Sequence, residues 1–203
     1  MSRRGRRPGG GDTRAAIVTA ARSEFAAKGY DATSLRAIAR AAEVDPALLH
    51  HYFDGKAALF TEVMDVPADP RVLIEAVVRG PREVVGEAMV RTFLTIWDSP
   101  EGRARFQGVV RSAVTNDEAA RMLREFLVRE IFGHVTRDLT PPGATGLAAN
   151  PELRAALAAG QMVGVGMMRY VIGFPSVVDA THDELIALLA PTLQQYLAPP
   201  VIP

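Results

Sequence analysis

The sequence predicts an all-α protein with a small N-terminal domain and a larger C-terminal domain, about nine helices in total. Apolar residues recur at three- and four-residue spacing along almost the whole chain, and alternating runs typical of strands are lacking. Pro67 and Pro70 separate a compact first set of helices from a longer second set. Residues 1–60 carry ten Lys and Arg against six Asp and Glu, whereas residues 61–203 carry thirteen against seventeen. The basic first part favours a polyanionic partner, with ordinary charge scatter as the alternative.

Composition excludes several classes of protein. The chain has 203 residues, 48% of them hydrophobic, which is enough for a substantial core. It has no cysteine, so disulfides and thiolate metal sites are excluded. No apolar run follows the basic N-terminus, and the apolar segment 155–168 is shorter than the roughly 20 residues of a membrane span. We therefore expect a soluble, cytoplasmic protein without a membrane partner.

The first helix is predicted from residue 12 to residue 28. Asp12 is a good N-cap, and Gly29 suits the left-handed position that follows a helix. Ile17, Ala21 and Phe25 lie four residues apart and should form its buried stripe.

The second and third helices are predicted to be joined by the short turn AAEVD, residues 41–45. The second begins at Thr33 or Ser34, since either hydroxyl can cap it. The third is capped by Asp45 and starts with Pro46, whose missing N–H is harmless at the first helical position. This arrangement indicates a helix-turn-helix, with a plain helical hairpin as the alternative.

The third helix should bury Val44, Leu49 and Phe53 against the others. A fourth helix, for which Asp54 is the expected N-cap, then runs toward Pro67. These helices make up the predicted N-terminal domain, residues 12–66, behind a basic flexible arm at residues 1–11.

The C-terminal domain is predicted to cover residues 67–203. Turn-forming residues and caps divide it into helices at about 70–79, 82–97, 99–115, 116–139, 150–174 and 182–197. The segment TPPGATGL, residues 140–147, is predicted to be a loop. Pro175 is expected to end the helix at 150–174.

The stretch TSLRAIARAAEVDPALLHHYFDGKAALF, residues 33–60, resembles the DNA-binding head of the TetR family of transcriptional regulators. The resemblance covers residues 12–65, including F-x-x-x-G-Y at the end of the first helix, with the helix-turn-helix motif at about 34–53. Beyond the head, the chain matches only in the number and order of its helices. The resemblance implies a homodimer that binds double-stranded DNA and a small-molecule effector.

By this resemblance the third helix lies in the major groove, where its N-terminal part faces the bases. The DNA-binding residues so implied are Thr33, Ser34, Arg36, Pro46, Ala47, Leu48, His50, His51, Tyr52 and Lys56. Arg36 either reads a guanine or contacts a phosphate. A lysine in the first turn of a helix opposes the macrodipole, which favours a phosphate contact for Lys56. Thr33 and Ser34 either cap the second helix alone or also bind phosphate.

The arginines of the N-terminal arm have two possible roles. They either reach into a minor groove or belong to a solubilising tail, and they are Arg3, Arg4, Arg6 and Arg7.

Glu43 departs from the family pattern, which usually has glycine at this position of the turn. If the backbone is left-handed there, glutamate costs roughly 1 kcal/mol relative to glycine. The resemblance therefore leaves the geometry of the turn open.

The paired histidines raise the question of a metal or catalytic site. Adjacent helical residues point about 100° apart, so one ion cannot easily use both His50 and His51. His134 and His182 are isolated, and the sequence lacks zinc-protease, phosphate-loop and nucleophile-elbow motifs. We expect no metal, no cofactor, no catalytic residue and no enzymatic activity.

Large apolar residues of the C-terminal domain form either core or, as the resemblance implies, an effector pocket. The candidate pocket residues are Phe93, Trp97, Phe106, Gln107, Met122, Phe126, Met162, Arg169 and Tyr170. Arg169 interrupts an apolar helix and should have a polar partner, either within the protein or on an acidic ligand.

The last two long helices are the candidate dimer surface. Two such helices from each chain would build a four-helix bundle, although burial within one chain is the alternative. The residues expected there are Leu153, Leu157, Gly160, Gly164, Met168, Leu185, Leu189, Leu193 and Tyr196.

The sequence thus predicts a homodimeric transcriptional regulator, a repressor that a small apolar or amphipathic ligand releases from a palindromic operator. When bound to DNA it would lie at the nucleoid. The alternatives are an activator, or a DNA-binding protein with the same head and no ligand. A more distant alternative is an enzyme or scaffold with a vestigial head.

Overall fold

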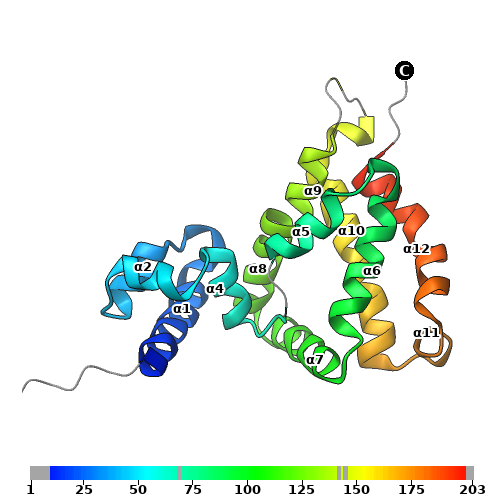
Figure 1. The fold of residues 1–203 in the computed structure, drawn as a ribbon. Helices are drawn as coiled ribbons and strands as arrows, with labels where there is room; N and C mark the ends of the chain where they lie inside the picture. The colour runs from blue at the N-terminus through cyan, green and yellow to red at the C-terminus, as the bar shows by residue number, and fades with distance from the viewer. Residues whose placement is uncertain (1–9, 68–69, 141–142, 144–145, 200–203) are drawn as a thin grey trace, which may run out of the picture.

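The computed structural model describes residues 10–67, 70–140, 143 and 146–199, and within these ranges the chain is helical with no strand. Figure 1 shows four N-terminal helices gathered in a head to one side of a larger helical body. The head consists of α1 (Gly10–Ala32), α2 (Leu35–Ala41), α3 (Pro46–Tyr52) and α4 (Lys56–Val63). The all-α prediction is confirmed.

The body contains more helical elements than predicted. They are α5 (Pro70–Val78), η1 (Arg82–Val84), α6 (Val85–Trp97), α7 (Pro100–Thr115), α8 (Asp117–Phe126), η2 (Leu127–Phe132), α9 (Gly133–Asp138), η3 (Gly146–Ala149), α10 (Pro151–Gly166), η4 (Met167–Ile172), α11 (Pro175–Val178) and α12 (His182–Leu197). Within the described residues, a π-helical turn divides the predicted helix 116–139, and the one-turn helix α11 follows η4. Because of these two features, the described residues form more helices than the predicted number of about nine.

The core of the head follows the predicted stripe. Ile17, Ala21 and Phe25 of α1 are fully buried, and Leu49 of α3 is fully buried beside them. The helical path of α1 breaks at Gly29, where φ is +82°, at the position expected for the helix end.

Two of the four predicted caps in the head are present, whereas the Asp12 prediction was wrong because α1 begins at Gly10 and Asp12 lies within its first turn. The Ser34 hydroxyl accepts a hydrogen bond from Ala37 N at 3.2 Å, and Asp45 Oδ1 accepts one from Ala47 N at 2.7 Å. At α4 the prediction was wrong, because the N-cap position is Gly55, with φ +96°, rather than Asp54.

The turn between α2 and α3 holds Glu43 in the left-handed region, with φ +54°. This is the conformation that favours glycine, so the glutamate is strained at the position where the sequence departs from the family pattern.

Close packing of α6 on α12 organises the body. A Cβ on Gly86 would lie 2.3 Å from the carbonyl oxygen of Ala190, so glycine is required for the two backbones to meet. The Gln194 amide also bridges them, because its oxygen accepts from Gly86 N at 2.9 Å and its nitrogen donates to Arg82 O at 2.7 Å.

A buried arginine ties α10 to the ends of two neighbouring helices. Arg154 is fully buried and donates to the carbonyls of Tyr196 and Leu197 in α12 and to Thr136 O in α9. The contact is favourable because the partial negative charge at a helix C-terminus attracts a positive guanidinium. It fixes α10 relative to α12.

The helix that contains α10 and η4 differs from its prediction in two ways. It ends at Gly173, which is left-handed with φ +70°, whereas Pro175 begins α11. Its range agrees with the predicted 150–174, but the membrane expectation rested on the apolar segment 155–168 alone, which the helix exceeds at both ends. By length and composition alone the 22-residue helix Pro151–Ile172 could cross a membrane, and 33% of its most apolar window is buried inside the protein. The expectation that it is too short was therefore wrong.

Candidate nucleic-acid interface and apolar cavity

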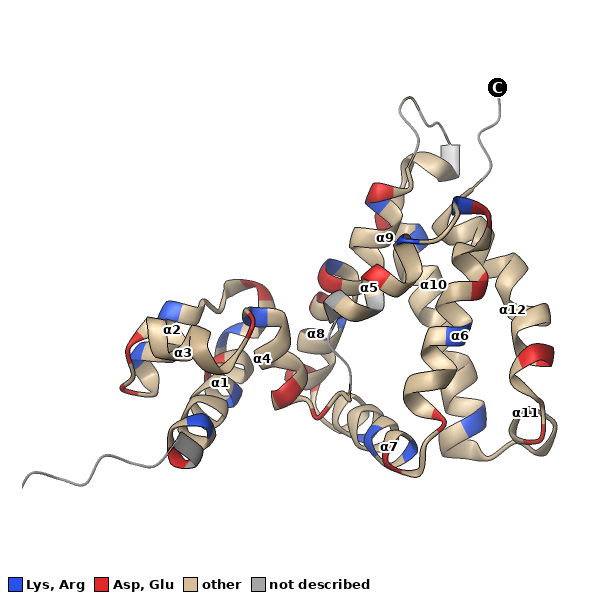
Figure 2. Ribbon diagram, viewed as in Figure 1, with Lys and Arg blue, Asp and Glu red and all other residues tan. Residues whose placement is uncertain are grey.

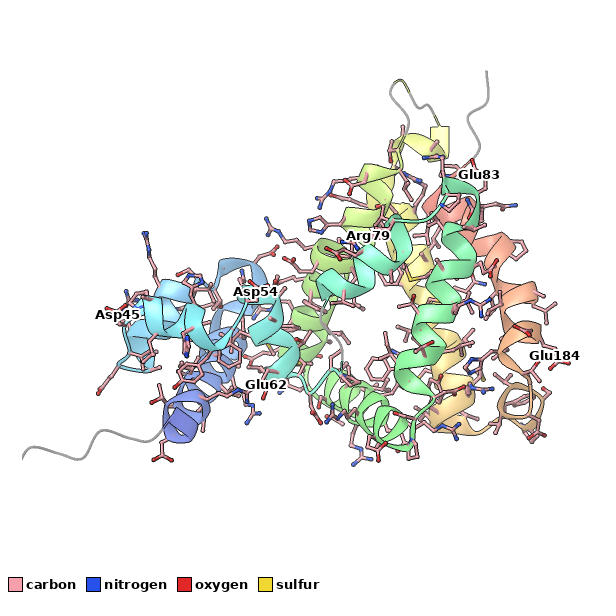
Figure 3. The ribbon with its side chains drawn as sticks, in the orientation of Figure 1. Asp45, Asp54, Glu62, Arg79, Glu83 and Glu184 are labelled. Carbon is pink, nitrogen blue, oxygen red and sulfur yellow. The ribbon has the colours of Figure 1, made fainter. Side chains whose placement is uncertain are left out.

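The outer face of α3 is open to solvent. Pro46, Ala47, His50 and His51 are exposed, and Leu48 is 38% exposed, while Tyr52 is half-buried. Figure 3 shows Asp45, the cap of α3, at the end of the head that lies far from the body. The face opposite Leu49 is thus free to approach a large partner.

At the start of α2, Thr33 and Ser34 differ in exposure, although the sequence predicts the same roles for both. Ser34 and Arg36 are exposed. Thr33 is only 3% exposed, and its hydroxyl donates to Gly29 O at 2.7 Å and Glu24 O at 3.1 Å. Thr33 therefore ties α2 to the end of α1, and the expectation that it contacts DNA is not supported by its burial.

Lys56 lies against the end of α1 rather than pointing outward. Its Nζ lies 4.4 Å from the centre of the Tyr30 ring and donates to Asp31 O at 3.2 Å. Burial lowers the pKa of Lys56, although the Asp31 carboxylate opposes that shift. A phosphate contact by Lys56 requires its side chain to leave this position.

Two further predictions concern the N-terminal arm and a metal site. The arm arginines Arg3, Arg4, Arg6 and Arg7 lie outside the described residues. Among the described residues, no group of three or more His, Cys, Asp or Glu side chains is arranged to hold a metal ion.

The body contains a cavity of about 140 Å³ between α5, α6, α7, α8, η2 and α10. Its lining residues are Thr61, Val66, Ile74, Val77, Met89, Thr92, Phe93, Ile96, Trp97, Phe106, Val109, Val110, Leu123, Phe126, Leu127, Ile131, Phe132, Val135, Ala159, Met162 and Val163. None of these described lining residues carries an ionisable side chain.

The candidate pocket residues divide into two groups. Five of them line the cavity, namely Phe93, Trp97, Phe106, Phe126 and Met162. Four do not line it, namely Gln107, Met122, Arg169 and Tyr170. Met122 is a core residue at 7% exposure, so it is buried without facing the cavity.

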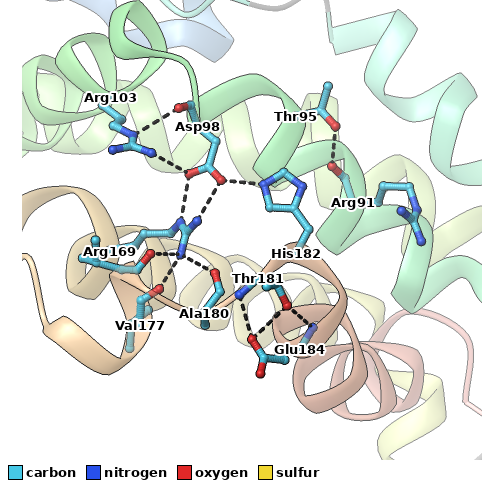
Figure 4. Close-up of polar contacts among 11 residues, drawn as sticks. Arg91, Thr95, Asp98, Arg103, Arg169, Val177, Ala180, Thr181, His182 and Glu184 are labelled. Atoms are coloured by element: carbon cyan, nitrogen blue, oxygen red, sulfur yellow. Dashed lines mark hydrogen bonds and ion pairs between the residues drawn. The ribbon is translucent and has the colours of Figure 1, made fainter.

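Arg169 has its partner within the protein. Its Nε and Nη2 donate to the two carboxylate oxygens of Asp98, each at 2.9 Å, and its Nη1 donates to the carbonyls of Val177 and Ala180 (Figure 4). Asp98 also lies 2.5 Å from His182 Nε2. Burial opposes ionisation of Asp98, but hydrogen bonds from Arg169 and His182 outweigh it and lower its pKa to about 2. This cluster joins α6, η4 and α12.

Gln107 and Tyr170 lie behind the cavity wall. The Gln107 amide donates to Tyr170 O at 2.5 Å. The Tyr170 ring packs against Phe93 and Phe106, with ring centres 6.3 and 5.3 Å away. Burial and the Asp98 carboxylate raise the pKa of Tyr170, which keeps its hydroxyl neutral.

The cavity wall includes residues that also belong to the head, which sequence patterns did not indicate. Thr61 of α4 lines the cavity, as does Val66, which follows that helix. Phe126 of α8 lines it too, and its ring lies 4.7 Å from the Phe60 ring and 5.6 Å from the Tyr30 ring. Core and cavity residues have the same apolar pattern, so periodicity cannot separate them.

Side chains of α8 and η2 make polar contacts with the end of α1. Arg121 donates to Lys28 O at 3.2 Å, and Glu125 accepts from Asp31 N at 3.1 Å. Gly29 lies between these side chains, because a Cβ there would be 2.4 Å from Arg121 Nη1. Arg129 adds an ion pair to the Asp31 carboxylate at 2.5 Å.

The far side of the body carries an exposed apolar face on α10 and η4. Leu153, Leu157 and Met168 are 45, 40 and 42% exposed, and a Cβ on Gly160 or Gly164 would meet nothing within 4 Å. Figure 2 shows long stretches of α10 and α12 without charged residues.

On α12 the candidate dimer residues differ in exposure. Leu185 and Leu193 are buried inside the chain, at 7 and 0%, while Leu189 and Tyr196 are half-buried. The large hydrophobic residue that α12 exposes most is Leu188, at 77%. Burial against the chain's own core thus accounts for Leu185 and Leu193, whereas Leu188 remains open to solvent.

Comparison with known proteins gives a consistent result for both parts of the chain. Residues 17–63 match the family of bacterial regulatory proteins of the tetR type, and residues 83–197 match the tetracyclin repressor-like C-terminal domain. Among curated proteins, none matches this chain.

Similar solved structures include a TetR-family regulator from Streptomyces coelicolor A3. It is 34% identical, with a TM-score of 0.45, and the match covers 95% of this chain and 98% of that one. Another is a putative TetR-family transcriptional regulator from Mesorhizobium loti MAFF303099. It is 20% identical, with a TM-score of 0.48, over 94% of this chain and 97% of that one. On the two family matches and the 34% identity, this chain belongs to the TetR family of DNA-binding transcriptional regulators.

Proposed function

We propose that the protein is a homodimeric repressor that leaves a palindromic operator when a small apolar ligand occupies the cavity. Residues 12–66 form the DNA-binding domain in this proposal, and residues 67–203 form the ligand-binding and dimerisation domain. The regulator acts in the cytoplasm, at the nucleoid when DNA-bound, and has no catalytic role. The observation that carries the proposal is the shared wall, in which Thr61 and Phe126 border both the cavity and the head.

DNA binding is assigned to α3 and the start of α2. Two adjacent imidazoles, those of His50 and His51, are exposed on α3, and a major groove is wide enough to admit such a helix. Arg36 is exposed on α2 and supplies a guanidinium for guanine or phosphate.

Dimerisation is assigned to the exposed apolar face of α10, η4 and α12. A two-fold axis brings the same face of each chain together, and the open positions at Gly160 and Gly164 let a partner helix come close. Two heads on one dimer can then read the two half-sites of a palindrome.

Release follows from the position of the cavity. A ligand among Phe126, Thr61 and Val66 acts directly on α4 and on the ring cluster of the head core. If it favours a different spacing of the two recognition helices, ligand and DNA oppose each other through one coupling free energy.

The first experiment measures binding of the purified full-length protein to DNA that flanks its own gene. We expect a complex of two chains per site whose affinity falls steeply with salt. Arg36→Ala should weaken binding or relax base preference at one position of each half-site, whereas Val114→Arg, a change at an exposed site on α7, should do neither. Absence of any complex at low salt would rule out the proposal.

An activator, or a regulator without a ligand, would use the same head. The lined cavity favours a ligand, so the discriminating measurement is release of the DNA complex by a cavity-binding molecule. Reporter expression that falls when the gene is deleted would identify an activator.

A further inference from the structure

The polarity of the cavity restricts what can bind in it. Apart from Thr61 and Thr92 and the indole N–H of Trp97, the described lining side chains offer carbon and thioether sulfur alone. Thr61 already donates its hydroxyl to Ala58 O at 2.9 Å within α4. A ligand that carries several polar groups would therefore leave most of them unpaired in an apolar site.

The arginine that the sequence suggested for the pocket, Arg169, is held elsewhere. The guanidinium of Arg169 binds both Asp98 oxygens and the carbonyls of Val177 and Ala180, and its side chain is only 7% exposed. Turning Arg169 into the cavity would break all of these bonds and leave the Asp98 carboxylate without its main partner. Arg169 is thus not available to bind an acidic ligand.

The size of the cavity restricts the ligand further. An apolar protein cavity of about 150 Å³ stays dry and binds benzene. The present cavity, at about 140 Å³, is of that order. Phe93, Phe106 and Phe126 give it several aromatic walls against which a planar ring can pack.

We propose that the effector is an uncharged, hydrocarbon-like molecule about the size of one aromatic ring, and that the cavity rejects charged molecules of the same shape. This rests on the proposed function, which makes the cavity the effector site, and it narrows the ligand from apolar or amphipathic to neutral and compact. A carboxylate or ammonium group would lose its hydration on entry and gain no partner in return.

The test compares probes that share one ring and differ in charge. Toluene, benzoate and benzylamine are titrated into the full-length protein without DNA, by calorimetry and by thermal unfolding. We expect one toluene per chain and a rise in melting temperature, with benzoate and benzylamine binding at least about a hundredfold more weakly. Equal or tighter binding of benzoate, or no binding of toluene, would overturn the inference.

Two variants show whether the probe occupies this cavity. Ala159→Phe places a ring in the space itself and should abolish toluene binding, whereas Ala76→Phe, at an exposed site on α5, should not. Val110→Lys adds an ammonium at the half-buried edge of the lining and should shift the preference toward benzoate. Toluene binding that survives Ala159→Phe in a folded protein contradicts the assignment.

The outcome is separable from that of the proposed function. DNA binding is measured without any probe, so it stands or fails independently. If a charged or much larger molecule releases the DNA complex, the repressor proposal stands and the neutral, single-ring ligand is wrong.

Discussion

The ring of Phe126 lies 4.7 Å from the ring of Phe60 and at the same time forms part of the cavity wall. Phe60 is fully buried in the head, where it also packs against Phe25 and Tyr30. One side chain of the body therefore touches both the effector space and the core that supports the recognition helix. We expect this contact to carry much of the coupling between ligand and DNA.

Phe126→Leu should weaken that coupling more than it weakens DNA binding alone. Leucine keeps an apolar side chain in the core but loses the ring contacts to Phe60 and Tyr30. The measurement is the ratio of DNA affinities with and without a saturating cavity ligand, which should move toward one. Val114→Ala, at an exposed site on α7 outside the cavity lining, serves as the control and should leave the ratio near that of the wild type.

Replacing Glu43 by glycine should stabilise the protein. A left-handed residue other than glycine costs roughly 1–2 kcal/mol, and the greater freedom of glycine in the unfolded chain offsets roughly 0.4–1 kcal/mol of the gain. We expect Glu43→Gly to raise the free energy of unfolding by about 0.5–1 kcal/mol in urea titrations. Glu43→Ala removes the same carboxylate without relieving the backbone, so a gain of equal size in that variant would point to charge instead.

The Asp98 cluster should make stability depend on pH at the acid end. Because its pKa is lowered to about 2 in the folded protein, Asp98 contributes stability that is complete above its ordinary pKa near 4 and is lost as the pH falls toward 2. Asp98→Asn should cost about 2 kcal/mol at neutral pH, and its difference from the wild type should shrink between pH 4 and pH 2. Unfolding curves across this range provide the test.

The exposed pair Arg91–Glu87 on α6 supplies the control for that experiment. Its side chains are about half exposed, so solvent screens the pair and it should contribute little to the free energy of unfolding. A loss in Glu87→Gln as large as that in Asp98→Asn would mean that burial of the Asp98 cluster is not what matters.

The dimer surface is tested by charge at positions that are exposed within one chain. Leu157→Arg and Leu188→Arg should leave the fold of the chain intact but convert a dimer to a monomer in light scattering. Affinity for the full palindrome should then drop roughly a hundredfold or more, because the second head no longer binds intramolecularly. Val114→Arg, at a site 78% exposed on α7, should remain dimeric. Dimers that persist in both leucine variants would place the interface elsewhere.

Local chemistry explains which features the sequence predicts well. The head helices and the caps at Ser34 and Asp45 depend on residues close together in the chain, whereas the sequence left the geometry at Glu43 open. The predicted starts of three body helices also follow from local chemistry, because the side chains of Ser99, Asn116 and Asn150 each accept a hydrogen bond from a backbone N–H three residues later.

Features that depend on distant segments were missed or misassigned. Arg169 was expected to have a partner, but Asp98 lies 71 residues away and no local pattern connects them. Thr33 has the residue type of a cap or a phosphate ligand, and only its burial distinguishes it from Ser34. Leu185 and Leu188 belong to one apolar stripe, although the first faces α6 and the other faces solvent.

The contacts between α8 and the end of α1 influence whether the head of one regulator can be replaced by the head of another. Arg121 and Glu125 hold the main chain of residues 28 and 31 rather than their side chains, and Gly29 provides the space between. A foreign head that has glycine at this position therefore keeps these two main-chain contacts, whereas the contacts of Arg129 and Phe126 also require the side chains that stand here at Asp31, Tyr30 and Phe60. Chimeras joined after α4 that keep these side chains should accept a new operator while still answering to this body's ligand.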